Sequence, residues 1–184
     1  MNPIVCLFPV IVMATGGHKY WLLRRVQPRK RELPRGWAHP DPLPPWQAEP
    51  YANLLQPALC GEMKVGDDAT LLHCLYRLAE EQGSWGFAQV LREKESALRE
   101  LPPIDGMHAF VVGLDVMEAH TYAPQFCAHA EHRQALWMTP DEVLAIEPVG
   151  LIEAHDGLPN DSKRMLPDYR DALREVIAWQ MGQN

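Results

Sequence analysis

Residues 76–83 read YRLAEEQG and form the second half of a pattern typical of an amphipathic helix. Apolar residues recur at helical spacing along one face of the segment 68–82, and polar residues gather on the opposite face. The apolar face consists of Leu71, Leu72, Leu75, Leu78 and Ala79, and the polar face includes His73, Arg77 and Glu80. Asp67 and Asp68 stand where the positive end of a helix favours carboxylates, and Gly83 stands where helices commonly stop. The sequence therefore predicts a helix over 68–82.

Two apolar segments at the start of the chain, residues 4–13 and 19–26, are rich in Val, Ile, Leu, Tyr and Trp. The four residues TGGH at 15–18 separate them, and the Gly-Gly pair supplies the positive φ angles that a tight hairpin needs. Reading the first apolar run as a signal sequence is disfavoured, because no Lys or Arg precedes it and it is too short to span a bilayer. We expect two antiparallel strands here, with the first of them buried.

The elements after the helix are predicted with differing clarity. The nearly continuous apolar run 108–116 and the short run 135–138 are typical of strands. The segment 85–101 fits either a helix ended by two prolines or, over its first residues, a strand, and periodicity leaves both open. A final amphipathic helix is expected over about 167–180.

The segment Thr139-Pro140-Asp141-Glu142 is a strong helix start. Thr139 suits the capping position, Pro140 suits the first helical position, and Glu142 is correctly spaced to complete a capping box. We therefore expect a helix that begins at Pro140.

A proline-rich segment occupies residues 29–57, and seven of the chain's 17 prolines fall between residues 34 and 57. Each proline fixes φ and removes an amide donor, which predicts an extended surface excursion instead of a core element. An interdomain linker is the weaker alternative, because several apolar residues of the segment could pack against the rest of the protein. These candidate anchors are Trp37, Trp46, Tyr51, Leu54 and Leu55. We therefore expect a single domain that spans residues 1–184.

Composition bounds the class of protein and its partners. The chain has 184 residues, a formal net charge of −7 and a pI near 5.6, which argue against a protein that tracks a long nucleic acid. A small phosphorylated ligand remains compatible with that charge. The four cysteines stand singly without a CxxC pair, which favours a reducing cytoplasm over a disulfide scaffold. We expect a cytoplasmic protein without membrane contact, and a homodimer is compatible with the sequence.

The order of these elements resembles the Nudix family of hydrolases, whose signature is GX5EX7REUXEEXGU with U a bulky aliphatic residue. Gly61 begins the matching segment, and the aligned positions Leu78, Glu80, Glu81 and Gly83 agree with the signature. Trp137 followed by the capped acidic helix start is similar to a later segment of the family. This resemblance spans about residues 4–150 and implies an α+β fold, an α/β/α sandwich with a mixed central sheet. The motif ALREL at 97–101 is a competing frame, but two prolines follow it where glutamates belong.

The chain departs from the signature at several positions. Asp67 stands in place of a glutamate, and eight residues instead of seven separate it from the rest of the motif. Tyr76 replaces the arginine, Arg77 replaces the first metal-binding glutamate, and Ser84 replaces the final aliphatic residue.

The resemblance implies a hydrolase that cleaves a nucleoside diphosphate-linked small molecule with Mg²⁺ or Mn²⁺. Several carboxylates would have to converge on the cation, and the candidates are Glu80, Glu81 and Asp67, with Asp68 and a later acid, Glu118 or Glu131. Arg77 lies three and four residues before Glu80 and Glu81, where it reaches both and competes with a cation. The alternative is therefore a catalytically degenerate Nudix-fold domain that binds a nucleotide or a protein partner.

Other residues carry weaker predictions. Arg77, Arg24 and Arg25 are candidates for binding a ligand phosphate, because guanidinium groups bind phosphate in a bidentate way. We read the segment Cys127-Ala128-His129-Ala130-Glu131-His132 as a polar loop, since its spacing fits no zinc site. The resemblance implies a catalytic base in this loop, and the candidates are Glu131 and His129. A purely structural scaffold within an oligomer is the third hypothesis.

Overall fold

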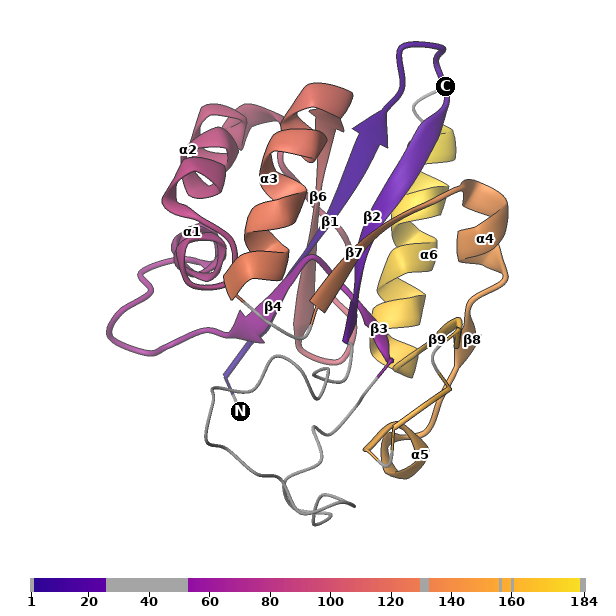
Figure 1. Ribbon diagram of the computed structural model, residues 1–184. Helices are drawn as coiled ribbons and strands as arrows, with labels where there is room; N and C mark the ends of the chain where they lie inside the picture. The colour runs from indigo at the N-terminus through magenta and orange to yellow at the C-terminus, as the bar shows by residue number, and fades with distance from the viewer. Residues whose placement is uncertain (1, 26–52, 130–132, 156, 160, 183–184) are drawn as a thin grey trace, which may run out of the picture.

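The computed structural model describes residues 2–25, 53–129, 133–155, 157–159 and 161–182. These residues form three layers, in which a mixed sheet lies between two groups of helices (Figure 1). The expected α+β class and its α/β/α sandwich are confirmed.

The sheet has nine strands within the described residues. They are β1 (Ile4–Val12), β2 (His18–Arg25), β3 (Leu55–Gln56), β4 (Leu59–Glu62), β5 (Arg99–Glu100), β6 (Met107–Asp115), β7 (Arg133–Met138), β8 (Glu147–Pro148) and β9 (Arg164–Met165). The main path runs β5-β6-β1-β2-β3-β9-β8, while β4 also pairs with β1 and β7 also pairs with β2. Strand β1 runs parallel to β6 and antiparallel to β2 and β4, which makes the sheet mixed.

Six α-helices cover the sheet in the described residues. They are α1 (Leu71–Gln82), α2 (Trp85–Glu93), α3 (Val116–His129), α4 (Pro140–Leu144), α5 (Leu151–His155) and α6 (Pro167–Gly182). Helices α1, α2 and α3 lie on one face, and α6 lies on the other with α4 beside it (Figure 1). A short 3₁₀ turn, Glu95–Ala97, links α2 to β5.

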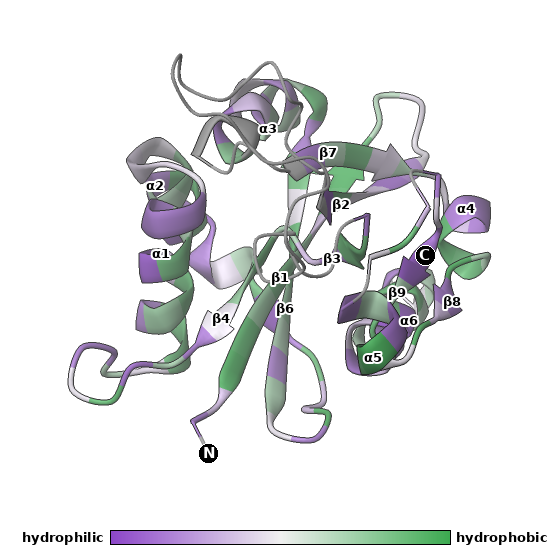
Figure 2. Cartoon of the chain, turned by 60° about the horizontal axis from the view of Figure 1, so that its bottom comes forward, coloured by the Kyte–Doolittle hydropathy of each residue, from purple (hydrophilic) through white to green (hydrophobic). Residues whose placement is uncertain are grey.

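Strand β1 is buried on both faces, because successive side chains of a strand point to opposite sides. Val5, Leu7 and Ile11 enter the core beneath α1, α2 and α3, where Trp21, Phe87 and Phe126 pack edge to face. The alternate residues of β1 enter a second core beneath α6, and they are Cys6, Phe8 and Val10. Figure 2 shows β1 hydrophobic over most of its length. A strand between two helical layers therefore reads as a continuous apolar run.

The strands β1 and β2 separate from one another along their length. They pair with each other through residues 10–12 and 18–20, near the hairpin turn. Farther from the turn, residues 4–7 of β1 pair with β4, while residues 23–24 of β2 pair with β3. Pro57 and Ala58 connect β3 to β4 and so cross from one branch of the sheet to the other.

Several sequence predictions are confirmed. The hairpin pairs Val12 with His18, although only Gly16 of the two turn glycines has a positive φ, at 87°. Strands are present at 107–115 and 133–138, and the last helix runs over 167–182. Helix α4 begins with the complete capping box expected at Thr139.

Other predictions need correction. Helix α1 begins at Leu71 with Thr70 as its cap, not at Asp68, because Asp68 turns inward and accepts the backbone N–H of Lys64. The open segment 85–101 is a helix followed by a short strand, and the competing ALREL frame lies outside any α-helix. The expected loop at 127–132 is in part helical, because α3 continues to His129.

The proline-rich segment is described only from Asn53 onward. Leu54 and Leu55 are buried, as expected of residues that anchor it. The other expected anchors, Trp37, Trp46 and Tyr51, lie outside the described residues.

Candidate functional site

The two glycines that match the signature have definite packing roles around α1. A Cβ atom on Gly61 would lie 2.5 Å from a methyl group of Leu78, so α1 packs directly against the β4 backbone. A Cβ atom on Gly83 would lie 2.7 Å from the ring of Phe126 and 2.9 Å from the backbone oxygen of Ala79. The signature positions therefore hold α1 against the sheet and against α3.

Arg77 lies at the centre of an ion-pair cluster between α1 and the loop after β4. Its guanidinium donates to both carboxylate oxygens of Asp68, at 2.7–3.2 Å, to Glu81 at 2.9 Å and to the backbone carbonyl of Glu62 at 2.9 Å. The side chains of Asp68 and Arg77 are only 2% and 17% exposed. Lys64 completes the cluster, since its ammonium lies 3.0 Å from Glu81. All three guanidinium nitrogens thus already have acceptors within the protein.

The charges in this cluster stabilise one another. The hydrogen bonds from Arg77 lower the pKa of Asp68 to about 2, assisted by the backbone N–H of Lys64 and against the effect of burial. The same carboxylate raises the pKa of Arg77 further above its usual range. Nearby Cys74 has its pKa raised to about 11, chiefly by burial. At neutral pH the cluster therefore holds a carboxylate and a guanidinium as a buried ion pair.

The acids expected to bind a metal ion do not converge on one point. Asp67, Asp68 and Glu80 line one cavity of about 510 Å³, but Arg77 and Arg92 line it with them. Glu80 points to α2 and pairs with Arg92 at 2.7 Å, whereas Glu81 pairs with Arg77 on the other side. Asp67 is exposed in the loop before the helix. Among the described residues no three His, Cys, Asp or Glu side chains are placed to hold a metal ion. A hard divalent cation needs several converging oxygens, and here a guanidinium lies among them, so these residues do not fit such a site.

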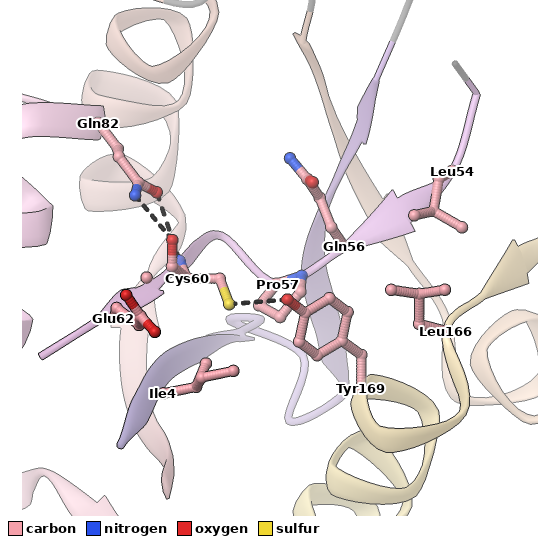
Figure 3. Close-up of a pocket in the computed structure, with 10 residues that line it drawn as sticks. Ile4, Leu54, Gln56, Pro57, Cys60, Glu62, Gln82, Leu166 and Tyr169 are labelled. Carbon is pink, nitrogen blue, oxygen red and sulfur yellow. Dashed lines mark hydrogen bonds between the residues drawn. The ribbon is translucent and has the colours of Figure 1, made fainter. Parts of the chain in front are cut away.

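A pocket opens on the other side of β4, where the two branches of the sheet separate (Figure 3). Its volume is about 460 Å³, and its wall combines apolar groups with a few neutral hydrogen-bonding groups. The apolar lining comes from Ile4, Leu54, Pro57 and Leu166, and the polar lining from Gln56, Cys60, Glu62, Gln82 and Tyr169. Glu62 is the one charged side chain among these described lining residues. The pocket therefore suits a neutral or partly apolar group.

Gln82 shapes one wall of this pocket from the last turn of α1. Its side-chain amide donates to the backbone carbonyl of Cys60 at 2.8 Å and accepts the backbone N–H of Cys60 at 3.3 Å (Figure 3). On the opposite side, the hydroxyl of Tyr169 in α6 lies 3.0 Å from the Cys60 thiol. β4 is thereby tied to helices of both layers at the same residue.

The remaining predicted site residues lie elsewhere or outside the description. Arg24 is half-buried in β2, and burial lowers its pKa. Arg25 ends β2, but the position of its side chain is not described, and Glu131 lies outside the described residues. Glu118 lies in the first turn of α3 and pairs with Lys94 at 3.1 Å, so its salt bridge lies outside the cluster around Arg77.

Sequence reasoning missed the residues that line the pocket, above all Cys60, Gln82 and Tyr169. Gln82 occupies an unspecified position of the signature, and Tyr169 lies 109 residues from Cys60. By contrast, the departure from the signature at Ser84 can be explained from the local sequence. Ser84 caps α2 by accepting the N–H of Phe87, and Ser is a favoured residue at that position.

Within the described residues, no helix combines the length and apolar character needed to cross a membrane. No protein-family model matches the chain, and no curated protein matches it in sequence. Among solved structures it is similar to a Nudix hydrolase from M. smegmatis, RenU, with a TM-score of 0.41 and 14% sequence identity. That similarity covers 97% of this chain and 87% of the other. A likeness at this level does not by itself assign the chain to a family.

Proposed function

We propose that this chain is a Nudix-like domain that binds a small ligand without metal-dependent hydrolysis, with Arg77 fixed where the signature has a metal-binding glutamate. The observation that carries the proposal is the buried ion pair between Arg77 and Asp68. Truncating one partner of such a pair leaves an uncompensated charge, so the pair is a permanent part of the fold. The guanidinium of Arg77 donates to Glu81 and to the backbone carbonyl of Glu62, and so supplies the positive charge that a divalent ion would otherwise supply.

The pocket beside β4 supports a ligand with a planar, neutral, hydrogen-bonding group. Small-molecule sites are usually concave and largely apolar, with few well-placed polar groups, and this pocket has that character. The amides of Gln56 and Gln82 offer both donors and acceptors, and Tyr169 offers an aromatic ring with a hydroxyl. Glu62 at the rim disfavours an anionic group inside. We therefore propose that the base of a nucleoside or nucleotide enters the pocket, with any phosphate directed outward.

Calorimetric titration with a panel of nucleosides and nucleotides tests the binding proposal. The expected result is saturable binding that is weakened in Tyr169→Ala, which removes the aromatic wall. Gln125→Leu serves as a matched control, because Gln125 bonds within α3 and does not line the pocket. Binding that is equally strong in wild type and Tyr169→Ala would show that the ligand lies elsewhere.

Turnover assays test the alternative, the metal-dependent hydrolase. Purified protein is incubated with nucleotide sugars, dinucleotides and nucleoside triphosphates in the presence of Mg²⁺ or Mn²⁺. We expect no hydrolysis above the protein-free rate. Metal-dependent turnover that is abolished in Glu81→Gln would overturn the proposal and establish the hydrolase.

A further inference from the structure

The thiols of Cys6 and Cys60 lie unusually close together on neighbouring strands. Their sulfur atoms are 2.9 Å apart, and the two residues are direct partners in the register of β1 and β4. We propose that they form a redox-active dithiol, which a small disulfide such as oxidised glutathione converts to a disulfide between the two strands. This inference does not depend on which ligand the pocket binds.

The backbone geometry suits such a bond. Both backbone polar groups of Cys60 bind Gln82, so they point away from β1. On the other side of this residue pair, β1 runs parallel to β6, with Cys6 beside Ala109. Cys6 and Cys60 are therefore a non-hydrogen-bonded pair, whose Cα atoms lie about 4.5 Å apart in antiparallel sheets. That separation falls within the range of about 4.4 to 6.8 Å observed for disulfides.

The two thiols differ in access from solvent. Cys6 is fully buried beneath α6, whereas Cys60 is partly exposed and lines the pocket. A small reagent entering the pocket therefore meets Cys60 first. Burial, together with the neighbouring Cys60 thiol, raises the pKa of Cys6 well above its usual value, which disfavours Cys6 as the first attacking thiolate.

The reaction balances in two exchange steps. The Cys60 thiolate attacks one sulfur of the small disulfide, which forms a mixed disulfide and releases the first small thiolate. The Cys6 thiolate then attacks the Cys60 sulfur and releases the second small thiolate. The two protein thiols are oxidised, the small disulfide is reduced, and the two protons end on the released thiols. The sulfurs approach from 2.9 Å to about 2.05 Å.

The structure also supplies a control cysteine. Cys74 lies on the buried face of α1 in the other core, and its sulfur lies 3.8 Å from the backbone carbonyl of Glu62. It lies on the opposite side of the sheet from Cys6, so the two are separated by the strands themselves. Replacing Cys74 and Cys127 with Ser leaves only the proposed pair.

The test equilibrates full-length wild type and the Cys74→Ser/Cys127→Ser variant with mixtures of reduced and oxidised glutathione. Samples are quenched with a maleimide and analysed by intact mass and peptide mapping. The expected product in both proteins has lost two hydrogens and contains a peptide linked through Cys6 and Cys60. Either an unreacted pair or a stable glutathione adduct as the main product would overturn the proposal.

A second variant separates the two steps. Cys6→Ala removes the resolving thiol, so Cys60 is expected to retain glutathione as a mixed disulfide. In wild type that adduct should be lower by on the order of tenfold or more, because an intramolecular thiol displaces it. Equal adduct levels in the two proteins would contradict the assigned order of attack. If Cys6→Ala fails to fold, the wild-type peptide map alone decides between the outcomes.

Discussion

The two sides of β4 differ sharply in their chemistry, although consecutive residues of α1 serve them. Glu81 belongs to the charged cluster around Arg77, and Gln82 binds the backbone of Cys60 at the edge of the pocket. The first side has ion pairs beside a cavity of about 510 Å³ lined mostly by charged residues. The second side has a cavity of about 460 Å³ in which Glu62 is the one charged residue of the described lining. The comparison shows that neighbouring residues of one helix can serve a charged cluster on one side and a mostly uncharged pocket on the other. We propose that Arg77 consolidates the first side and that a ligand binds in the cavity on the second side.

Removing the acid of the buried ion pair should give the largest effect. Asp68→Ala leaves the guanidinium of Arg77 without its main partner in a site that is mostly buried. We expect the free energy of unfolding to fall by about 3–5 kcal/mol, measured by urea denaturation. The exposed neighbour offers the control, since Asp67→Ala should change stability by no more than about 0.5 kcal/mol. Equal small effects in both variants would show that the cluster is not structural.

The packing of α1 should be nearly as sensitive. In Gly83→Ala the new methyl group meets the Phe126 ring and a backbone oxygen, and the backbone cannot give way. We expect a loss of about 1–3 kcal/mol from overpacking, again from denaturant curves. Gly150→Ala is the matched control, because nothing lies within 4 Å of its added Cβ.

Acid titration should reveal the same ion pair. The folded-state pKa of Asp68 is about 2, below its ordinary value of 3.8. A depressed pKa means that the stabilisation is fully present above the unfolded pKa and is lost as pH falls from about 4 through 2. The loss should be about 2 kcal/mol, measured as the change in unfolding free energy with pH. Asp68→Asn should flatten this part of the profile, and an unchanged slope would rule out Asp68 as its source.

Substitutions of residues that line the pocket should lower stability less than substitutions in the ion-pair cluster. Gln82→Leu removes two hydrogen bonds to the backbone of Cys60 at a half-buried position. We expect a loss of about 1–2 kcal/mol, together with weaker ligand binding by calorimetry. Gln125→Leu is the control for a general effect of losing an amide. A binding constant that does not change in Gln82→Leu would separate this residue from the ligand site.

Local patterns predicted the frame of the molecule well. The hairpin, the capping box at Thr139 and the amphipathic face of α1 depend on neighbours in sequence, and all three are present. The start of α1 was misplaced because Asp68, a good helix-start residue, is used instead to bind Arg77. Helix α3 was missed although its buried residues follow helical spacing, and these are Ala119, Ala123 and Phe126.

The site depended on contacts that no local pattern contains. The cluster joins Arg77 to Asp68 across a turn, while Cys6 meets Cys60 only because β1 and β4 pair. The four cysteines stand singly in the sequence without a CxxC pair, and the pairing of β1 with β4 brings two of them together. The sequence indicated that Arg77 would compete with a metal ion for the neighbouring acids. It did not indicate that Asp68 is the main partner of Arg77, because Asp68 lies nine residues earlier, before α1 begins.

We propose that Arg77 takes the place of a divalent cation, and the dependence of stability on added metal tests this most directly. Melting temperatures of wild type, Arg77→Glu and Arg77→Gln are compared with and without Mn²⁺. Arg77→Glu places a third carboxylate beside Asp68 and Glu81. We therefore expect a lower melting temperature than wild type without metal, and a rise of several degrees with saturating Mn²⁺. Wild type and Arg77→Gln should not respond. A wild type that Mn²⁺ stabilises as much as it stabilises Arg77→Glu would contradict the account.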